Sequence, residues 1–249
     1  MINHYIPQLS TIKEVIKHTD LEYTFRMTFD GTAKPGQFFE ISIPKYGEAP
    51  ISVSGIGDGL VDFTIRRVGK VTNEIFENYV GDSFFIRGPY GNGFDMENYR
   101  NKELVIVAGG TGLSPVRGVV DYFAHHTEEA VSTTLIAGFK SPKDVLFKAD
   151  FEFWKENIDV IQTVDTAPEE YEGPVGMVTK YIPDLKFQDI NNTAFICVGP
   201  PIMIKFTVME ILKLGVPEEN IWISHERKMC CGLGKCGHCK IGSTYICLD

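Results

Sequence analysis

The stretch VAGGTGLSPV, residues Val107–Val116, decides how the second half of this sequence folds. It ends an apolar strand pattern, Leu104–Ala108, and leads into helical spacing over Ser114–His125. A strand, a glycine-rich turn and a helix start together offer free N–H groups and a positive dipole end to a pyrophosphate. The pattern is not the G-x-G-x-x-G fingerprint of dinucleotide-binding folds. A tight turn that binds no ligand therefore remains the alternative interpretation. The nucleotide contacts that it predicts are Gly109, Gly110, Thr111, Gly112 and Pro115.

Strand and helix patterns alternate on both sides of this turn, from residue 102 to about residue 224. Such alternation predicts a parallel sheet with helices on both faces. The further strands expected are Thr133–Ala137, Val160–Val164, Phe195–Val198 and Ile221–Ser224, and the further helices are Asp144–Glu156 and Ile202–Leu214.

A second turn, CVGPPIM, follows the strand Phe195–Val198. Because ligands bind at the carboxyl ends of strands in such sheets, this turn should share a rim with the first one. The expected nucleotide contacts here are Cys197, Gly199, Pro200 and Met203. A small buried residue is the other interpretation of Cys197.

The first part of the chain, residues 10 to about 95, has the alternation of half-buried strands. Apolar and polar residues alternate over Tyr23–Phe29, Phe39–Ile43 and Val61–Ile65, with glycine-containing turns between them. Several short strands at this spacing predict a small antiparallel barrel. One helix-like stretch, Thr72–Tyr79, interrupts them.

Five of the six cysteines lie in the last 20 residues. The spacing C-x4-C-x2-C with a later fourth cysteine is the plant-type [2Fe–2S] arrangement. It assigns the metal ligands to Cys231, Cys236, Cys239 and Cys247, and leaves Cys230 as an extra thiol. Gly232, Gly234, Gly237 and Gly242 would permit the tight turns of such a loop. A structural zinc site is the alternative, although zinc sites usually use paired C-x2–4-C ligands.

The expected architecture is therefore β followed by α/β: a barrel over residues 1–98, a parallel-sheet domain over 99–224, and a cysteine tail over 225–249. The net charge of −9 comes without a basic stripe, which argues against a nucleic-acid binder. The apolar stretches are too short to span a bilayer, and no targeting segment is visible. We therefore expect a cytoplasmic protein.

The order of barrel, GGTG turn and CGPP turn resembles the ferredoxin–NADP reductase superfamily. In that family an Arg-x-x-Ser strand meets FAD, with the serine facing the isoalloxazine. This chain has Pro50-Ile51-Ser52-Val53 but Ala49 in place of the arginine. Arg66 or Arg67, with the turn Gly69–Thr72, could supply the phosphate contact instead. The FAD contacts implied by the resemblance are Pro50, Ile51, Ser52, Val53, Ile65, Arg66, Gly69, Lys70, Val71 and Thr72.

The cysteine tail resembles a narrower branch, which includes dihydroorotate dehydrogenase electron-transfer subunits and sulfhydrogenase gamma subunits. Four strings are most similar to the electron-transfer subunits of anaerobic sulfite reductase: 47–54, 65–72, 198–204 and 234–239. The resemblance implies a sirohaem-type sulfite reductase catalytic subunit as partner, with a further iron–sulfur subunit left open. A dihydroorotate dehydrogenase or a hydrogenase is the alternative partner. The alternative from another functional class is a regulatory module that is stabilised by zinc and binds a nucleotide without catalysis.

The resemblance also implies an order of electron transfer. NADH or NADPH would give a hydride to FAD beside Ser52, and single electrons would leave through the [2Fe–2S] cluster. Cys197 would lie near the nicotinamide, and Glu226 would fix the edge of the flavin or the nicotinamide. An ordinary solvated carboxylate is the other interpretation of Glu226. The nucleotide preference stays open, although Lys140 could reach the 2′-phosphate of NADPH.

Overall fold

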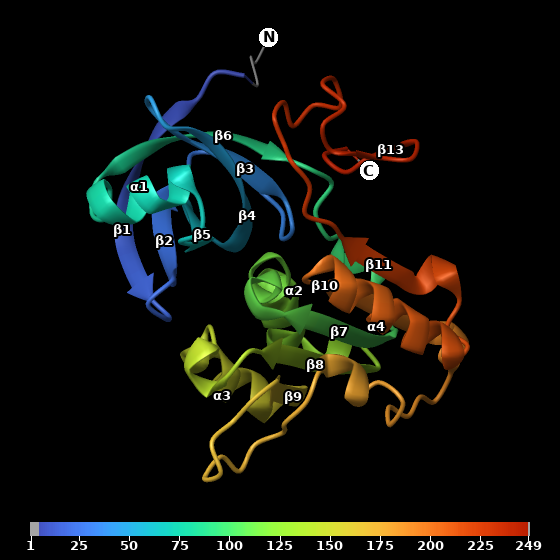
Figure 1. Ribbon diagram of the computed structural model, residues 1–249. Coiled ribbons are helices and arrows are strands. Elements are labelled where there is room, and N and C mark those ends of the chain that lie inside the picture. The colour runs from blue at the N-terminus through green and yellow to red at the C-terminus, as the bar shows by residue number, and fades with distance from the viewer. Residues whose placement is uncertain (1–4, 249) are drawn as a thin grey trace. The chain divides into compact units, whose positions relative to one another are not determined.

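The computed structural model describes residues 5–248 and divides into two compact units (Figure 1). One unit combines Met1–Phe94 with Glu226–Asp249, and the other is Asp95–His225. The domain boundary therefore lies four residues before the expected one. No helix within residues 5–248 has the length and apolar character needed to cross a membrane.

The first unit is a closed barrel of six antiparallel strands in the order β1-β2-β5-β4-β3-β6 (Figure 1). Alternate side chains, among them Phe25, Phe39 and Phe63, fill its interior and are fully buried. The predicted barrel is confirmed. The strands are β1 Gln8–Lys17, β2 Glu22–Thr28, β3 Phe38–Ile43, β4 Gly47–Gly57, β5 Leu60–Arg66 and β6 Ser83–Tyr90, and the helix is α1 Lys70–Asn78.

The second unit is a five-stranded parallel sheet in the order β11-β10-β7-β8-β9. The chain order reverses between β7 and β10, which are hydrogen-bonded neighbours, so this pair is the topological switch point of the sheet. The strands are β7 Glu103–Gly109, β8 Ser132–Phe139, β9 Asp159–Val164, β10 Thr193–Val198 and β11 Ile221–Ser224. The predicted parallel-sheet domain is confirmed.

Helices cover both faces of this sheet. α2 and α3 pack together on one face, and α4 packs on β10 with η5 beside it. The helices are α2 Leu113–His125, α3 Lys148–Asn157 and α4 Pro201–Lys213. Short 3-10 turns are η1 Met96–Asn98, η2 Gly110–Gly112, η3 Thr127–Glu129, η4 Pro142–Asp144, η5 Val178–Lys180, η6 Ile190–Asn192 and η7 Glu218–Asn220.

The helix expected from Asp144 begins only at Lys148. Val145, Leu146 and Phe147 are all buried, and Phe147 has a left-handed backbone with φ of 53°. These three apolar side chains enter the core as an irregular segment, which delays the first helical turn.

The cysteine tail, expected as a unit of its own, groups with the barrel. It contains a two-stranded hairpin, β12 Lys240–Ile241 and β13 Thr244–Tyr245. The buried Cys239 and Cys247 pack with Phe38 of β3 and Tyr90 of β6. A segment this short has too little apolar surface for a core of its own, so it shares one with the outside of the barrel.

Candidate functional site

Four of the tail cysteines approach one another in two pairs. The sulfurs of Cys239 and Cys247 are 3.4 Å apart, and both side chains are buried. Two thiolates on one tetrahedral metal with bonds of about 2.3 Å would be roughly 3.8 Å apart. In the second pair, the Cys231 side chain hydrogen-bonds the Cys236 thiol. Two pairs of sulfurs are what a two-iron centre with two terminal ligands on each iron requires.

Backbone N–H groups surround these sulfurs. The Cys231 Sγ accepts from the amides of Leu233 and Lys235 at 3.4 Å, and the Cys247 Sγ accepts from the amide of Gly234 at 3.2 Å. The pKa of the Cys236 thiol is lowered, because the backbone N–H of His238 and the Cys231 side chain hydrogen-bond to it. Donors aimed at sulfur stabilise thiolates, which are the metal-binding form. The residues present therefore fit a cluster held by thiolates.

The structure also separates Cys230 from Cys231. Cys231 is buried and receives two amides, whereas Cys230 is exposed. This geometry favours Cys231 as the ligand. Within residues 5–248, no group of three or more His, Cys, Asp and Glu side chains is arranged to hold a single metal ion.

Gly232 allows the tail to approach the barrel closely. Its backbone has φ of 72°, and a Cβ on this residue would lie 2.6 Å from the Tyr90 ring. Gly234, Gly237 and Gly242 also have positive φ, as the predicted turns require. A side chain at position 232 would push the loop off Tyr90 as well as strain the backbone.

Arg87 of β6 fastens the tail to the barrel, and no sequence motif predicted it. Its guanidinium donates to both carboxylate oxygens of Glu48, at 2.8 and 2.6 Å. It also donates to the carbonyl oxygens of Cys230 and Cys231, at 2.8 and 3.2 Å, and to the Tyr90 hydroxyl at 3.0 Å. The arginine side chain is only 4% exposed. No local pattern signals this role, because the residues it joins are far apart in sequence.

Glu40 of β3 lies beside Arg87 in the strand register and is 1% exposed. Its Oε1 has no hydrogen-bond partner within the described residues. Burial raises the pKa of this carboxyl to about 7, although the nearby Arg87 charge opposes the rise. Its position alternates with the inward-facing Phe39 and Ile41, so the sequence suggests an exposed acid.

The strand predicted to meet FAD is β4. Pro50 is exposed there, Ile51 and Ser52 are half-buried, and Val53 points into the core. Ser52 pairs with Phe38 and Pro50 with Glu40 in the β3–β4 register. The backbone of β4 therefore presents a partly open surface, which a planar ligand could cover.

The two arginines considered for the flavin phosphates already have carboxylate partners. Arg66 lies 2.8 Å from Glu22, and Arg67 pairs with Glu77. Lys70, at the start of α1, lies instead over the ring of Tyr46 at 5.6 Å. The first turn of α1 holds no acidic side chain, so its free N–H groups and Lys70 together suit an anion.

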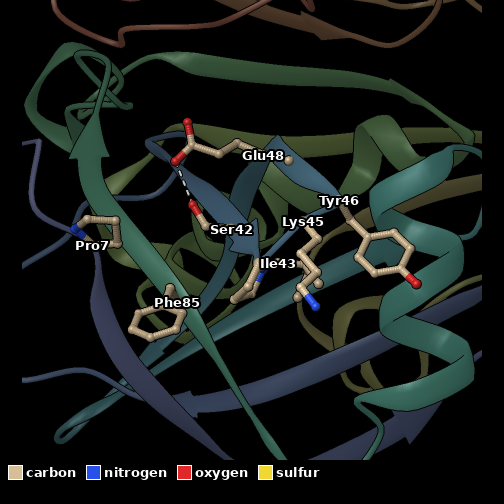
Figure 2. Close-up of a pocket in the computed structure, with 9 residues that line it drawn as sticks. Pro7, Ser42, Ile43, Lys45, Tyr46, Glu48 and Phe85 are labelled. Atoms are coloured by element: carbon tan, nitrogen blue, oxygen red, sulfur yellow. Dashed lines mark hydrogen bonds between the residues drawn. The ribbon is translucent and has the colours of Figure 1, made fainter.

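An open pocket of about 590 Å³ lies at the turn between β3 and β4 (Figure 2). In Figure 2 the Glu48 carboxylate accepts a 2.5 Å hydrogen bond from the Ser42 hydroxyl, and the Tyr46 ring points toward α1. The lining residues are Pro7, Ser42, Ile43, Pro44, Lys45, Tyr46, Gly47, Glu48 and Phe85. The lining contains none of the β4 residues predicted to meet FAD, Pro50–Val53, and reaches β4 only at Gly47 and Glu48.

The two glycine turns of the second unit meet at the switch point between β7 and β10. A Cβ on Gly112 would lie 2.7 Å from the Val198 carbonyl oxygen, and one on Gly199 would lie 2.7 Å from the end of Met203. Gly110 has φ of 56°, and nothing lies within 4 Å of its Cβ position. The turns pack backbone against backbone and leave the Gly110 side open, which suits a pyrophosphate.

Ser114, which no sequence motif singled out, lies in the first turn of α2. It is 3% exposed, and its hydroxyl has no hydrogen-bond partner within residues 5–248. Thr111 and Pro115 lie on either side of it in the same turn, η2 to α2. Its place next to the glycine turn is the one sequence signal that could have drawn attention to it.

The chain is similar along nearly its whole length to subunits of larger enzymes. It is 34% identical to sulfhydrogenase 1 subunit gamma of Pyrococcus furiosus, covering 99% of this chain and 90% of that one. It is 30% identical to a probable dihydroorotate dehydrogenase B (NAD(+)) electron transfer subunit of Thermoplasma volcanium, covering 96% and 85%. This chain belongs to that electron-transfer subunit family.

The electron-transfer subunit is an oxidoreductase with the ferredoxin reductase fold. The Oxidoreductase NAD-binding domain family matches its residues 106–209. The solved NADH-dependent reduced ferredoxin-NADP oxidoreductase matches it with a TM-score of 0.80 and 25% identity, covering 97% of this chain and 86% of that one. A ferredoxin NADP+ reductase from Neisseria gonorrhoeae, solved with bound FAD and NADP, matches its fold with a TM-score of 0.74, 18% identity and coverages of 87% and 98%.

Two expected catalytic residues of the electron-transfer subunit have contrasting surroundings. Cys197 is fully buried among Val107, Ile211 and Met203, and burial raises the pKa of its thiol to about 12. Glu226 is exposed at the start of the tail segment. A role for either residue at the nicotinamide or the flavin stays a prediction.

Proposed function

We propose that this chain oxidises NAD(P)H and passes electrons singly to a catalytic subunit, with FAD on the barrel and a [2Fe–2S] cluster in the tail. The observation that carries the proposal is the pairing of Cys231 with Cys236 and of Cys239 with Cys247, against the same barrel that presents Ser52. When bound, FAD would convert the two electrons of a hydride into single electrons, which the cluster carries.

The protein's own groups would bind and orient the reactants. The amides of Gly110–Gly112 and the first turn of α2 would hold the nicotinamide pyrophosphate. On the barrel, Lys70 and the first turn of α1 would neutralise the flavin phosphates in place of the missing arginine at position 49. The Ser52 hydroxyl would hydrogen-bond the flavin edge. The amides of Leu233, Gly234 and Lys235 would stabilise the thiolates.

For the partner we propose a catalytic subunit of the sulfhydrogenase or dihydroorotate dehydrogenase kind. This follows from the relatives, which are named as subunits of these two enzymes. A sirohaem-type sulfite reductase is the second candidate, because the strings 47–54 and 234–239 resemble the electron-transfer component of that enzyme. None of the relatives described above belongs to a sulfite reductase.

An anaerobic preparation tests the central proposal. It should contain one FAD and two irons per chain, and a titration with NADH and then with NADPH should bleach the flavin and cluster absorbance. Colourless protein that contains zinc and no iron would instead support the regulatory module. Isolation of the native complex, assayed with hydrogen, dihydroorotate and sulfite, would identify the catalytic subunit.

A further inference from the structure

The cysteine tail has an excess of basic side chains that the rest of the chain does not share. Residues 225–249 contain four of the 24 lysines and arginines but only two of the 33 acids, so these side chains sum to +2 in a chain of −9, before the charge of the cysteine thiolates is added. All four cations are exposed: Arg227, Lys228, Lys235 and Lys240. The one described acid among them, Glu226, is also exposed.

These cations differ from the arginines of the barrel in their partners. Arg26, Arg66, Arg67 and Arg87 are each paired with a carboxylate. In contrast, Arg227 reaches the Lys240 carbonyl oxygen at 3.5 Å, Lys235 lies over the Tyr5 ring and Lys240 over the Tyr245 ring. Over residues 5–248, none of the four tail cations has a carboxylate partner. Their charge is available to another molecule.

Two of the cations, Lys235 and Lys240, flank the most exposed part of the cysteine loop in the sequence. Lys235 directly precedes Cys236, and the run from Lys235 to His238 is exposed throughout. Arg227 contacts the hairpin at Lys240. Two apolar side chains add to this surface, Ile241 at 41% and Leu248 at 46% exposure. Apolar groups within a charged rim are typical of a protein interface.

We propose that this basic surface around Cys236 is where single electrons leave the protein, and that it docks a partner subunit presenting carboxylates around an apolar centre. The proposal rests on the proposed function, since it assigns a partner chemistry to the same cluster. Opposite charges would guide the partner to the exposed side of the loop and shorten the electron path. The acidic remainder of the chain would repel that partner elsewhere.

Small charged oxidants can probe this surface before the partner is known. NADH would reduce two ferricyanide trianions or two hexaammineruthenium(III) trications, giving NAD+, a proton and two one-electron products. The rate through the cluster is the wild-type rate minus that of Cys236→Ser, which retains only the flavin route. For ferricyanide this rate should fall on the order of tenfold between low and high ionic strength, and for the ruthenium cation it should rise.

Lys235→Glu with Lys240→Glu should flatten or reverse both salt dependences, whereas Lys13→Glu, on an exposed position of β1, should leave them unchanged. The reduction potential of the cluster should be measured in each variant by EPR. An unchanged potential would show that the substitutions alter how often the oxidant approaches the surface, and not the free energy of electron transfer. Three results would overturn the proposal: the same salt response for both oxidants, an effect of Lys13→Glu as large as that of the double variant, or a change in the cluster's potential large enough to explain the changed rates.

A dimer that dissociates with salt in light scattering would make a second copy of this chain the occupant of the surface instead. Protein without iron would overturn the proposed function itself, whereas iron with no salt dependence would overturn only the surface.

Discussion

Arg87 and Glu48 form a two-pronged ion pair on the outside of the barrel, with donor–acceptor distances of 2.8 and 2.6 Å. The pair matters because the same guanidinium holds the carbonyl oxygens of Cys230 and Cys231. Glu48 therefore orients Arg87, and Arg87 orients the first turn of the cysteine loop. The barrel is in this way a rigid mount for the residues expected to hold the cluster.

Arg87→Met should loosen the tail without unfolding the barrel. The loss of hydrogen bonds to two carbonyl oxygens and a carboxylate costs about 2 kcal/mol, which corresponds to roughly 30-fold faster amide exchange in the tail. Hydrogen-exchange mass spectrometry over residues 229–248 would measure this. Arg87→Lys should recover only part of the protection, because lysine cannot reproduce the fork. Arg26→Met removes a barrel ion pair that does not touch the tail and serves as control; equal loosening by both variants would contradict the anchor.

Cys236→Ser should remove the cluster, whereas Cys230→Ser should keep it. The reason is that Cys236 is paired with Cys231, while the exposed Cys230 offers only its carbonyl oxygen to Arg87. Iron content and the EPR signal of the reduced protein would measure the difference. FAD reduction by NADH should survive in both variants. If Cys230→Ser lost its iron and Cys236→Ser kept it, Cys230 would be the ligand and Cys236 the extra thiol.

Glu40 should make stability depend on pH between about 4.5 and 7. Its pKa is raised to about 7, first by burial and then by the Glu48 and Cys231 charges, against the effect of Arg87. The folded protein thus keeps a proton that the unfolded chain has already released, so stability falls as pH rises through this window and levels off above it. The full effect is up to about 3 kcal/mol.

Glu40→Gln, which imitates the protonated acid, should be free of this loss. The melting temperature of the variant minus that of the wild type should increase from pH 5 to pH 8. Glu14→Gln, on an exposed carboxylate paired with Arg26, is the matched control. A difference that stays constant with pH would show that Glu40 keeps an ordinary pKa.

The two folds could be predicted because their signals are local. The strand Leu104–Ala108 is buried on both faces, so its apolar run and the glycines after it are visible in any ten residues. The spacing of the cysteines that are expected to hold the cluster is also a local signal, because it lies within one short loop. The alternation in β2 and β5 reflects a barrel interior filled from alternate positions.

The remaining features depend on contacts between distant segments. Glu48, Arg87 and Cys231 meet only because the tail returns to the barrel. Arg66 and Arg67 pair with carboxylates on β2 and α1. Because these pairs cannot be seen in the sequence, it offered no reason to prefer Lys70 over the two arginines as the contact for the flavin phosphates. α3 starts late because Val145–Phe147 are buried in the core as an irregular segment. The spacing of apolar residues in the sequence does not show this.

Ser52→Ala should slow hydride transfer while FAD stays bound. The side chain is half-buried on β4, so its loss removes one hydrogen bond to the flavin edge and little packing. A decrease of about tenfold is expected in the stopped-flow rate of flavin reduction by NADH. Ser54→Ala alters a fully buried serine in the same strand that bonds to Thr64 and the Asp62 carbonyl oxygen, and it tests general damage to the barrel. An unchanged rate in Ser52→Ala would move the flavin edge elsewhere.

Lys70→Met should weaken FAD binding more than Arg66→Met does. Lys70 contributes a charge over the Tyr46 ring at the start of α1, whereas Arg66 is held 2.8 Å from Glu22. The loss of one charge-assisted phosphate contact costs about 1.5 kcal/mol, or roughly tenfold in Kd. Flavin fluorescence during titration of the apoprotein with FAD would measure it, and Lys70→Arg should restore most of the affinity because it keeps the charge. If Arg66→Met has the larger effect, the ion pair with Glu22 must open when FAD binds, and the phosphate contact belongs to the arginine.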